Sequence, residues 1–193
     1  PEAEADEVLI QVEAAAASFA DSLMIRDLHQ NKHTLPFAPG MEVAGEIIGL
    51  GKDVSGLKIG DRVIALVYDG GYAERAVAPA TETFRIPDSM EAGTAAAMCA
   101  SYLTSHGALV WQARTEPGER VLVLGAAGGV GLAAVEIAKA LGATVIAAAS
   151  TPEKLALAAA HGADHGINYS EGDLREQVLG LTDGNGVDIV YDP

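Results

Sequence analysis

The chain has 193 residues, 49% of them apolar, which is enough for a packed core in one large domain or two small ones. Its formal net charge of −15 is spread along the chain, which argues against nucleic acid or an anionic membrane as the main partner. The single cysteine, Cys99, excludes an internal disulfide and a cysteine-based zinc site, and no apolar run reaches the length of a membrane span. We therefore expect a cytoplasmic protein.

The first half of the chain predicts short strands separated by glycine turns, which is typical of a small β-barrel. Ser18-Phe-Ala-Asp21 is expected to open a short helix that ends near Arg26, and residues 27–39 to form a polar loop. The two segments around Asp69-Gly70-Gly71 are expected to pair as a hairpin. The expected strands cover residues 8–17, 42–48, 61–67 and 72–78.

The second half predicts an α/β fold. Residues 89–114 are alanine-rich and helical, with an expected break at Cys99–Ser101. Thr151 is expected to cap one later helix, and Ser170 with Asp173 to open another that ends near Gly184. Strands are expected at residues 121–124, 144–148, 167–169 and 187–191. Helical crossovers between them predict a Rossmann-type parallel sheet, incomplete at about four strands where the full dinucleotide fold has about six.

A glycine-rich turn connects the first of these strands to a helix with apolar positions at helical spacing. The turn reads Ala126-Ala127-Gly128-Gly129-Val130-Gly131. Gly128 and Gly129 let the backbone approach a pyrophosphate, Gly131 lets the helix pack close to the strand, and the helix N-terminus attracts phosphate. The alternative is a plain tight turn, but the strand before it and the helix after it favour dinucleotide binding.

Motifs from one end of the chain to the other resemble the medium-chain dehydrogenase/reductase superfamily, and within it the zinc-free quinone oxidoreductase branch. The matching segments are Ser18-Phe-Ala-Asp21, Pro39-Gly-Met-Glu-Val-Ala-Gly45, Gly60-Asp-Arg-Val63, Gly70-Gly-Tyr-Ala-Glu74, Tyr102-Leu-Thr104, Ala126–Gly131, and Gly162-Ala-Asp with Asn168-Tyr169.

The resemblance implies two domains with the cofactor in the cleft between them. Residues 1–97 correspond to part of a chaperonin-10-like catalytic domain, and residues 98–193 to linker helices plus the first part of a Rossmann NADPH-binding domain. The family's last two Rossmann strands have no counterpart here. The chain is therefore expected to be a fragment of a longer enzyme, which is expected to form a homodimer at full length.

Three positions distinguish the zinc-free branch. Where the zinc-dependent relatives carry a Cys, a His and a Cys, this sequence has Ser18, Met41 and Ala100. None of these is an effective zinc ligand, so we expect no bound metal. Asp21 and Glu42 remain, and structural hydrogen bonding is a sufficient role for both.

The end of the second Rossmann strand indicates the cofactor. NAD-binding domains place an acid about 20 residues beyond the glycine turn, whereas Ala149 stands there in this chain. Ser150, Thr151 and Lys154 follow and could bind a 2′-phosphate, which predicts NADPH. In the resembled family, Lys154 and Tyr169 match residues that flank that phosphate. The alternatives are a solvated helix lysine and a tyrosine that only packs at a strand end.

The substrate side is expected to include Ser18, where the family most often has Asn, and His29, where it often has Tyr. Thr104 matches a residue near the nicotinamide, although it could be an ordinary helix threonine. The resemblance implies hydride transfer from NADPH to a quinone or another conjugated acceptor. An enoyl-thioester reductase and a non-catalytic NADPH-binding protein of the crystallin type are the alternatives.

Overall fold

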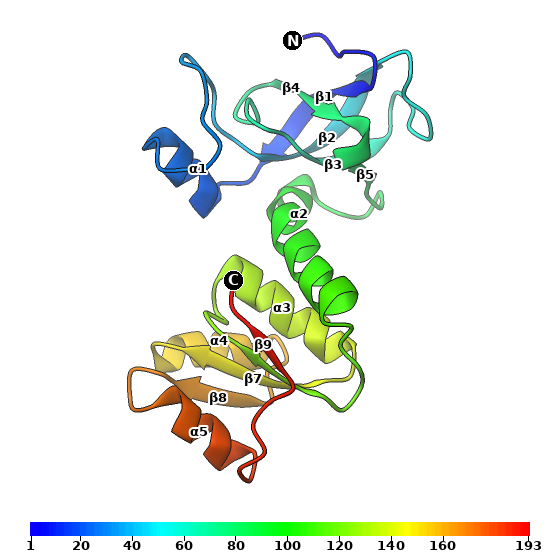
Figure 1. Cartoon of the computed structure of the whole chain (residues 1–193). Helices are drawn as coiled ribbons and strands as arrows, with labels where there is room; N and C mark the ends of the chain where they lie inside the picture. Colours follow the sequence, from blue (N-terminus) through cyan, green and yellow to red (C-terminus); the bar gives the residue numbers. More distant parts are fainter. The chain divides into compact units, whose positions relative to one another are not determined.

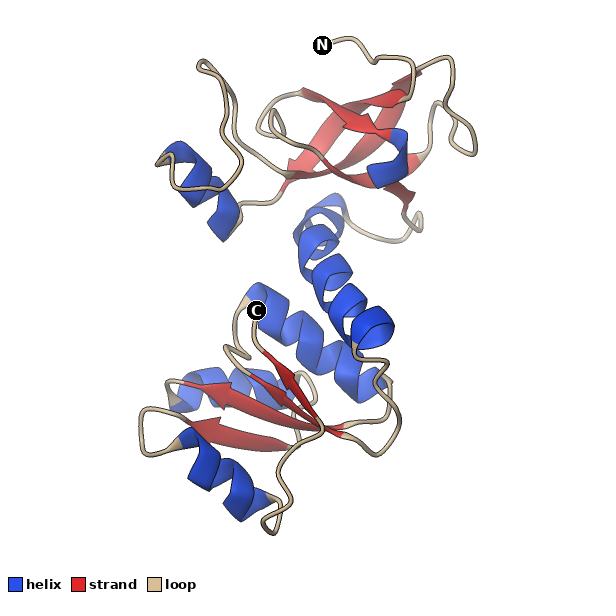
Figure 2. Cartoon of the chain, viewed as in Figure 1, coloured by secondary structure: helices blue, strands red, loops and turns tan.

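A five-stranded antiparallel sheet dominates the first half of the chain, in the order β4-β1-β2-β3-β5. The computed structural model describes residues 1–193 and divides them into two compact units, Pro1–Ala100 and Ser101–Pro193. Figure 1 labels the elements, and Figure 2 shows that strands prevail in the first unit. Its elements are β1 (Glu7–Ala15), α1 (Phe19–Ile25), β2 (Glu42–Leu50), β3 (Arg62–Leu66), β4 (Arg75–Pro79), η1 (Ala80–Glu82) and β5 (Thr83–Arg85).

Alternating side chains give the first sheet two apolar faces. One face forms a closed core in which Val8, Ile10, Val43 and Ile47 are fully buried. The other face includes Ala44 and is covered by the first turns of α2 (Ala92–His106), which bury Cys99. Because the alternation places apolar residues on both faces, this small sheet is stabilised from two sides.

A four-stranded parallel sheet forms the second unit, in the order β8-β7-β6-β9. Val121 and Val123 face α3 and α4, whereas Leu122 faces α5. Helices therefore cover both faces of the sheet, as Figure 1 shows. The elements are η2 (Gly107–Gln112), β6 (Arg120–Val123), α3 (Gly129–Ala140), β7 (Thr144–Ala149), α4 (Pro152–Ala160), β8 (His165–Asn168), α5 (Leu174–Leu181) and β9 (Ile189–Tyr191).

This order confirms the predicted fold class, a Rossmann-type parallel sheet preceded by a small antiparallel β domain. The chain leaves β6 for β7 on one side and returns to β9 on the other, so the order reverses between β6 and β9. Ligands of doubly wound sheets bind at such a reversal, outside the carboxyl ends of the strands. No helix in the chain is long and apolar enough to cross a membrane.

The hairpin expected around Asp69-Gly70-Gly71 is wrong. β4 pairs with β1, and β3 lies between β2 and β5. The connecting segment bonds instead to residues 38–41: Gly70 N donates to Ala38 O at 2.7 Å and Tyr72 N to Pro39 O at 2.9 Å. These bonds to a distant segment direct β4 away from β3.

Two expected helix features are also wrong. α2 runs without a break through Cys99–Ser101, and the irregularity lies later, in the π-helical turn η2. The last helix begins at Leu174 and not after Ser170, because Asp173 Oδ1 accepts from Glu176 N at 2.9 Å and forms the cap. The predicted cap at Thr151 and the predicted start of a helix at Ser18 are confirmed, and each side-chain oxygen accepts an N–H of the first turn.

Candidate functional site: the glycine turn and the strand ends around it

The glycine turn lies at the carboxyl end of β6 and opens α3. Gly125 adopts φ +57°, a left-handed conformation that favours glycine, and the chain then enters α3 through Gly128. No side chain caps α3, so its first N–H groups lack a side-chain acceptor. Such N–H groups, together with the helix dipole, attract an anionic ligand group.

Gly131 is required by the close approach of α3 to this turn. A Cβ atom at Gly131 would lie 2.3 Å from Gly125 O and 2.9 Å from Ala126 Cα. Both obstacles are backbone atoms, so no side-chain movement could make room. The close packing expected of Gly131 is thus present.

Buried Ser105 connects the second half of α2 to the start of α3 and to β9. Its hydroxyl donates to Val130 O at 2.9 Å and lies 3.1 Å from the hydroxyl of Tyr191 on β9. The neighbouring Thr104, predicted near the nicotinamide, has an exposed side chain. The residue that anchors the helix here is therefore Ser105, which the sequence motif did not single out.

The polar residues predicted for the adenosine side meet at the carboxyl ends of β7 and β8. Lys154 Nζ donates to Ser150 Oγ at 3.1 Å, across the first turn of α4. Ser170, which follows β8, donates through its hydroxyl to Ser150 O at 3.3 Å. Tyr169 is 43% exposed, and its amide bonds to Ala149 O. The structure brings these residues together beside the glycine turn, whose Ala126 N donates to Ala148 O at 3.2 Å.

One carboxylate close to this cluster did not enter the sequence prediction. Glu153 follows Pro152 in the first turn of α4, and a hydrogen bond with Thr151 lowers its pKa. The side chain is therefore ionised at neutral pH and opposes part of the attraction that Lys154 exerts on a phosphate. Because Glu153 is fully exposed, water and salt screen this repulsion.

In the first unit, the buried carboxylate of Asp21 accepts hydrogen bonds from Ser18 and Tyr72. Asp21 Oδ2 accepts from the amide of Ser18 at 2.8 Å, its hydroxyl at 2.9 Å and the Tyr72 hydroxyl at 3.0 Å, while Oδ1 accepts from Gly40 N at 2.9 Å. Burial and the bond to Asp21 raise the pKa of Tyr72. Both hydroxyls thus direct their protons at Asp21 and present only acceptor lone pairs to any substrate.

A second buried carboxylate supports the same unit. Glu42 Oε2 accepts from Ala100 N at 2.8 Å, and burial, more than nearby Asp21, raises the pKa of Glu42. Burial also raises the pKa of Cys99 to about 12, which keeps this thiol protonated and unreactive at neutral pH. Asp21 and Glu42 therefore act as structural hydrogen-bond acceptors.

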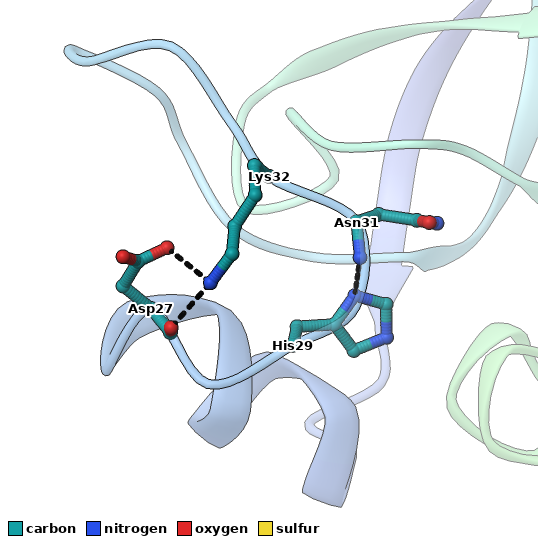
Figure 3. A network of polar contacts seen from close by, with 4 residues as sticks. All are labelled: Asp27, His29, Asn31 and Lys32. Atoms are coloured by element: carbon teal, nitrogen blue, oxygen red, sulfur yellow. Dashed lines mark hydrogen bonds and ion pairs between the residues drawn. The ribbon is translucent and has the colours of Figure 1, made fainter.

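His29, the second expected substrate-side residue, lies in the loop after α1. Its Nδ1 accepts from Asn31 N at 3.2 Å, and Lys32 Nζ donates to Asp27 O at 2.6 Å and Oδ1 at 2.8 Å (Figure 3). All of these contacts join residues of the same loop, so they stabilise its conformation locally.

The zinc positions of the resembled family do not hold a zinc donor set. The Ser18 hydroxyl is engaged by Asp21, and Met41 and Ala100 offer no strong ligand. No group of three or more His, Cys, Asp or Glu side chains in the chain is arranged to hold a metal ion. The residues present therefore do not fit a catalytic zinc.

Family models match both units. The alcohol dehydrogenase GroES-like domain covers residues 4–88, and the model described as zinc-binding dehydrogenase covers residues 129–193. Quinone oxidoreductase-like protein 2 of Bos taurus is 43% identical over 96% of this chain and 54% of its own length. The chain belongs to the quinone oxidoreductase branch of the medium-chain dehydrogenase/reductase superfamily.

Solved structures agree with this membership. The quinone oxidoreductase from Thermus thermophilus, also solved in complex with NADPH, has a TM-score of 0.85 and 40% identity, with 100% of this chain and 60% of that chain covered. The CurK enoyl reductase has a TM-score of 0.89 and 33% identity over 100% of this chain and 60% of its own. The chain spans about half the length of the curated relatives that it matches.

Proposed function

We propose that the protein is an NADPH-dependent oxidoreductase that transfers hydride to a quinone or another conjugated acceptor without zinc. The observation that carries the proposal is a glycine turn beside a strand end that has Ala149 in place of an acid, where Lys154 Nζ donates to Ser150 Oγ. In this assignment residues 98–193 bind the cofactor, and residues 1–97 carry the substrate-side Ser18.

The residues of the second unit fit NADPH. The free N–H groups at Gly129, Val130 and Gly131 suit the pyrophosphate, with Ala127 and Gly128 shaping its approach. Ser150, Thr151, Lys154 and Tyr169 suit the adenosine phosphate, and Thr104 the nicotinamide side. When bound, NADPH supplies the hydride. The relatives solved with NADPH support this choice of cofactor.

Lys154 is expected to determine the preference for NADPH over NADH. Replacing Lys154 by Ala removes a charge-assisted bond worth about 1.5–3 kcal/mol, which corresponds to roughly tenfold to a hundredfold weaker NADPH binding. NADH binding should hardly change. Fluorescence titration with both cofactors measures this difference.

Two control variants complete this test. Lys154→Arg keeps the charge and should retain most of the preference for NADPH, and Lys58→Ala, in the first unit, should leave both affinities unchanged. An equal loss for both cofactors in Lys154→Ala would show that Lys154 acts through packing or stability, and would remove the main support for NADPH.

The proposed absence of zinc rests on donor chemistry at Ser18, Met41 and Ala100. Elemental analysis of protein purified without chelator is expected to find far less than one zinc per chain. About one tightly held zinc per chain would contradict the proposal, even though the fold assignment would stand.

The hydrogen bonding of the first unit supports a conjugated acceptor. The Ser18 and Tyr72 hydroxyls donate to Asp21, so neither is free to polarise a carbonyl oxygen. An acceptor must then delocalise the charge that it gains, as quinones and enones do and saturated ketones do not. The similarity to the CurK enoyl reductase makes an enoyl-thioester the second candidate, since it is also conjugated.

A further inference from the structure

Ser18 and Tyr72 direct their hydroxyl protons at one buried atom. Oδ2 of Asp21, a residue that is only 3% exposed, lies 2.9 Å from Ser18 Oγ and 3.0 Å from Tyr72 Oη. The amide of Ser18 donates to the same atom at 2.8 Å, and Gly40 N donates to Oδ1 at 2.9 Å. The carboxylate thus accepts four hydrogen bonds, so both hydroxyl protons are committed to it.

The direction of the Tyr72 hydroxyl is fixed by its surroundings. Burial and the bond to Asp21 raise the pKa of Tyr72, so the phenol keeps its proton at neutral pH. The ring lies against the backbone of Gly40, where a Cβ atom would be 2.6 Å from Tyr72 Cδ1. In addition, Tyr72 N donates to Pro39 O at 2.9 Å. The ring cannot turn its hydroxyl elsewhere without losing these contacts.

Both hydroxyl oxygens still have room for one more hydrogen bond. Tyr72 is 41% exposed and Ser18 is half-buried. Tyr72 Oη accepts no hydrogen bond within the protein, and Ser18 Oγ accepts only the amide of Asp21, at 3.4 Å. Because a hydroxyl oxygen has two lone pairs, each can accept from a ligand, but neither has a proton left to donate.

The charges around the pair also favour a donor. Asp21 and Glu42 are the two groups whose charges act on the Tyr72 hydroxyl, and both raise its pKa. No Lys, Arg or His side chain forms an ion pair with either carboxylate. The potential beside the two hydroxyls is therefore negative, which attracts the positive end of an O–H or N–H dipole and repels an anion or another acceptor oxygen.

We propose that Ser18 and Tyr72 select conjugated acceptors that carry a hydrogen-bond donor on a substituent, such as a hydroxymethyl group, which donates to one of the two hydroxyl oxygens. The inference rests on the function proposed above, which assigns Ser18 to the substrate side. The donor belongs to a substituent because the reacting carbonyl oxygen only accepts and would meet lone pairs. Ser18 and Tyr72 are thus determinants of specificity and take no part in the hydride transfer.

The test compares two quinones that differ in this donor alone, hydroxymethyl-naphthoquinone and its methyl ether. Steady-state reduction by NADPH should give a kcat/KM about tenfold higher for the alcohol, because the ether oxygen cannot donate and faces the lone pairs of the site. Equal values, or a preference for the ether, would overturn the proposal.

Two variants show whether the preference arises at this pair. Tyr72→Phe removes one acceptor and should lower the preference for the alcohol about threefold or more. Ser18→Asn keeps a good cap for α1, and its amide brings two N–H groups, so one can replace the bond to Asp21 while the other faces the substrate. This variant should lose most of the preference. Tyr68→Phe is the control, because Tyr68 is 75% exposed and its hydroxyl bonds to no group of the protein, and it should behave as the wild type. An unchanged preference in folded Tyr72→Phe and Ser18→Asn would also overturn the proposal.

A binding measurement separates this proposal from the proposed function. Naphthalenemethanol and its methyl ether carry the same two substituents but cannot accept a hydride, and titration calorimetry measures their affinities without turnover. A protein that reduced neither quinone would contradict the proposed function, whereas about tenfold tighter binding of the alcohol would still support the donor-selecting pair. Equal binding of the two compounds, or no binding of the alcohol up to its solubility, would overturn that pair in a protein without turnover.

Discussion

Backbone geometry at the start of α3 requires glycine at position 131. The turn before α3 brings Gly125 O so close that even one added carbon would overlap with it. The glycine fingerprint predicts this closeness from the sequence, because the strand, the turn and the helix are adjacent along the chain.

The variant Gly131→Ala is expected to lower the free energy of unfolding of the second unit by about 1–3 kcal/mol, since the overlap is with backbone atoms that cannot move aside. Urea unfolding followed by the fluorescence of Trp111, the single tryptophan, reports on this unit. Gly180→Ala is the matched control, because a Cβ at this α5 position meets nothing within 4 Å. It should be neutral or stabilising by up to about 1 kcal/mol. A Gly131→Ala protein as stable as Gly180→Ala would contradict this explanation.

Other residues could not have been placed from the sequence. His33 stands in a polar loop, and its partner Asp69 lies 36 positions later, in a segment expected to be a hairpin turn. Tyr72 and Asp21 are similarly separated by 51 positions. Such pairs depend on the path of the chain through the whole sheet, which neither periodicity nor spacing records.

At the scale of elements, two of the local signals at helix starts were reliable, whereas the pairing of distant strands was not. The cap at Thr151 and the start of the first helix at Ser18 were predicted correctly, and both depend on residues three positions apart. The pairing of β3 and β4 was predicted wrongly, because bonds from the connecting segment to residues 38–41 outweigh closeness in sequence. A local signal failed at the start of α5, because two candidate caps, Ser170 and Asp173, lay three residues apart and Asp173 forms the cap.

Glu136 links three elements of the second unit. Its carboxylate on α3 accepts from the Tyr102 hydroxyl on α2 and lies 2.6 Å from Nδ1 of His161 at the end of α4. The Tyr102 bond, followed by the His161 contact, lowers the pKa of Glu136 below its ordinary 4.5, while the same bond raises the pKa of Tyr102 to about 12. The ionised carboxylate therefore stabilises this helix arrangement.

The sign of the resulting pH dependence follows from the lowered pKa. The stabilisation by Glu136 is fully present above 4.5 and is lost as the pH falls through the lower value in the folded protein. Glu136→Gln should therefore be less stable than the wild type at pH 7, and its stability should fall less steeply below pH 4.5. Urea midpoints followed by Trp111 fluorescence between neutral and acidic pH measure both effects.

Glu176→Gln is the control for this pH dependence, because Glu176 is exposed on α5 and its side chain carries no ion pair. This variant should follow the wild-type profile. If Glu136→Gln and Glu176→Gln gave the same profile, the linkage through Glu136 would be refuted.

At the scale of the whole molecule, the fold class of each unit could be predicted, because the change from short strands to alternating strands and helices is visible in the sequence. Residues 4–88 and 129–193 match separate family models. The chemistry of the site is less accessible from sequence, since the role of Ser105 and the directions of the Ser18 and Tyr72 hydroxyls became visible only in the structure. Glu153, by contrast, follows Pro152 in the predicted helix and could have been placed there from the sequence.

The central claim is hydride transfer from NADPH to conjugated acceptors without a metal. Steady-state oxidation of NADPH by the protein, measured with a small quinone, an enone, a saturated ketone and, in reverse with NADP⁺, a simple alcohol, tests it most directly. We expect a quinone or enone to be reduced far faster than the ketone, with negligible alcohol oxidation and no effect of added chelator. Faster oxidation of the alcohol than reduction of any conjugated acceptor would contradict the account, and tight NADPH binding without turnover of any acceptor would favour a non-catalytic protein.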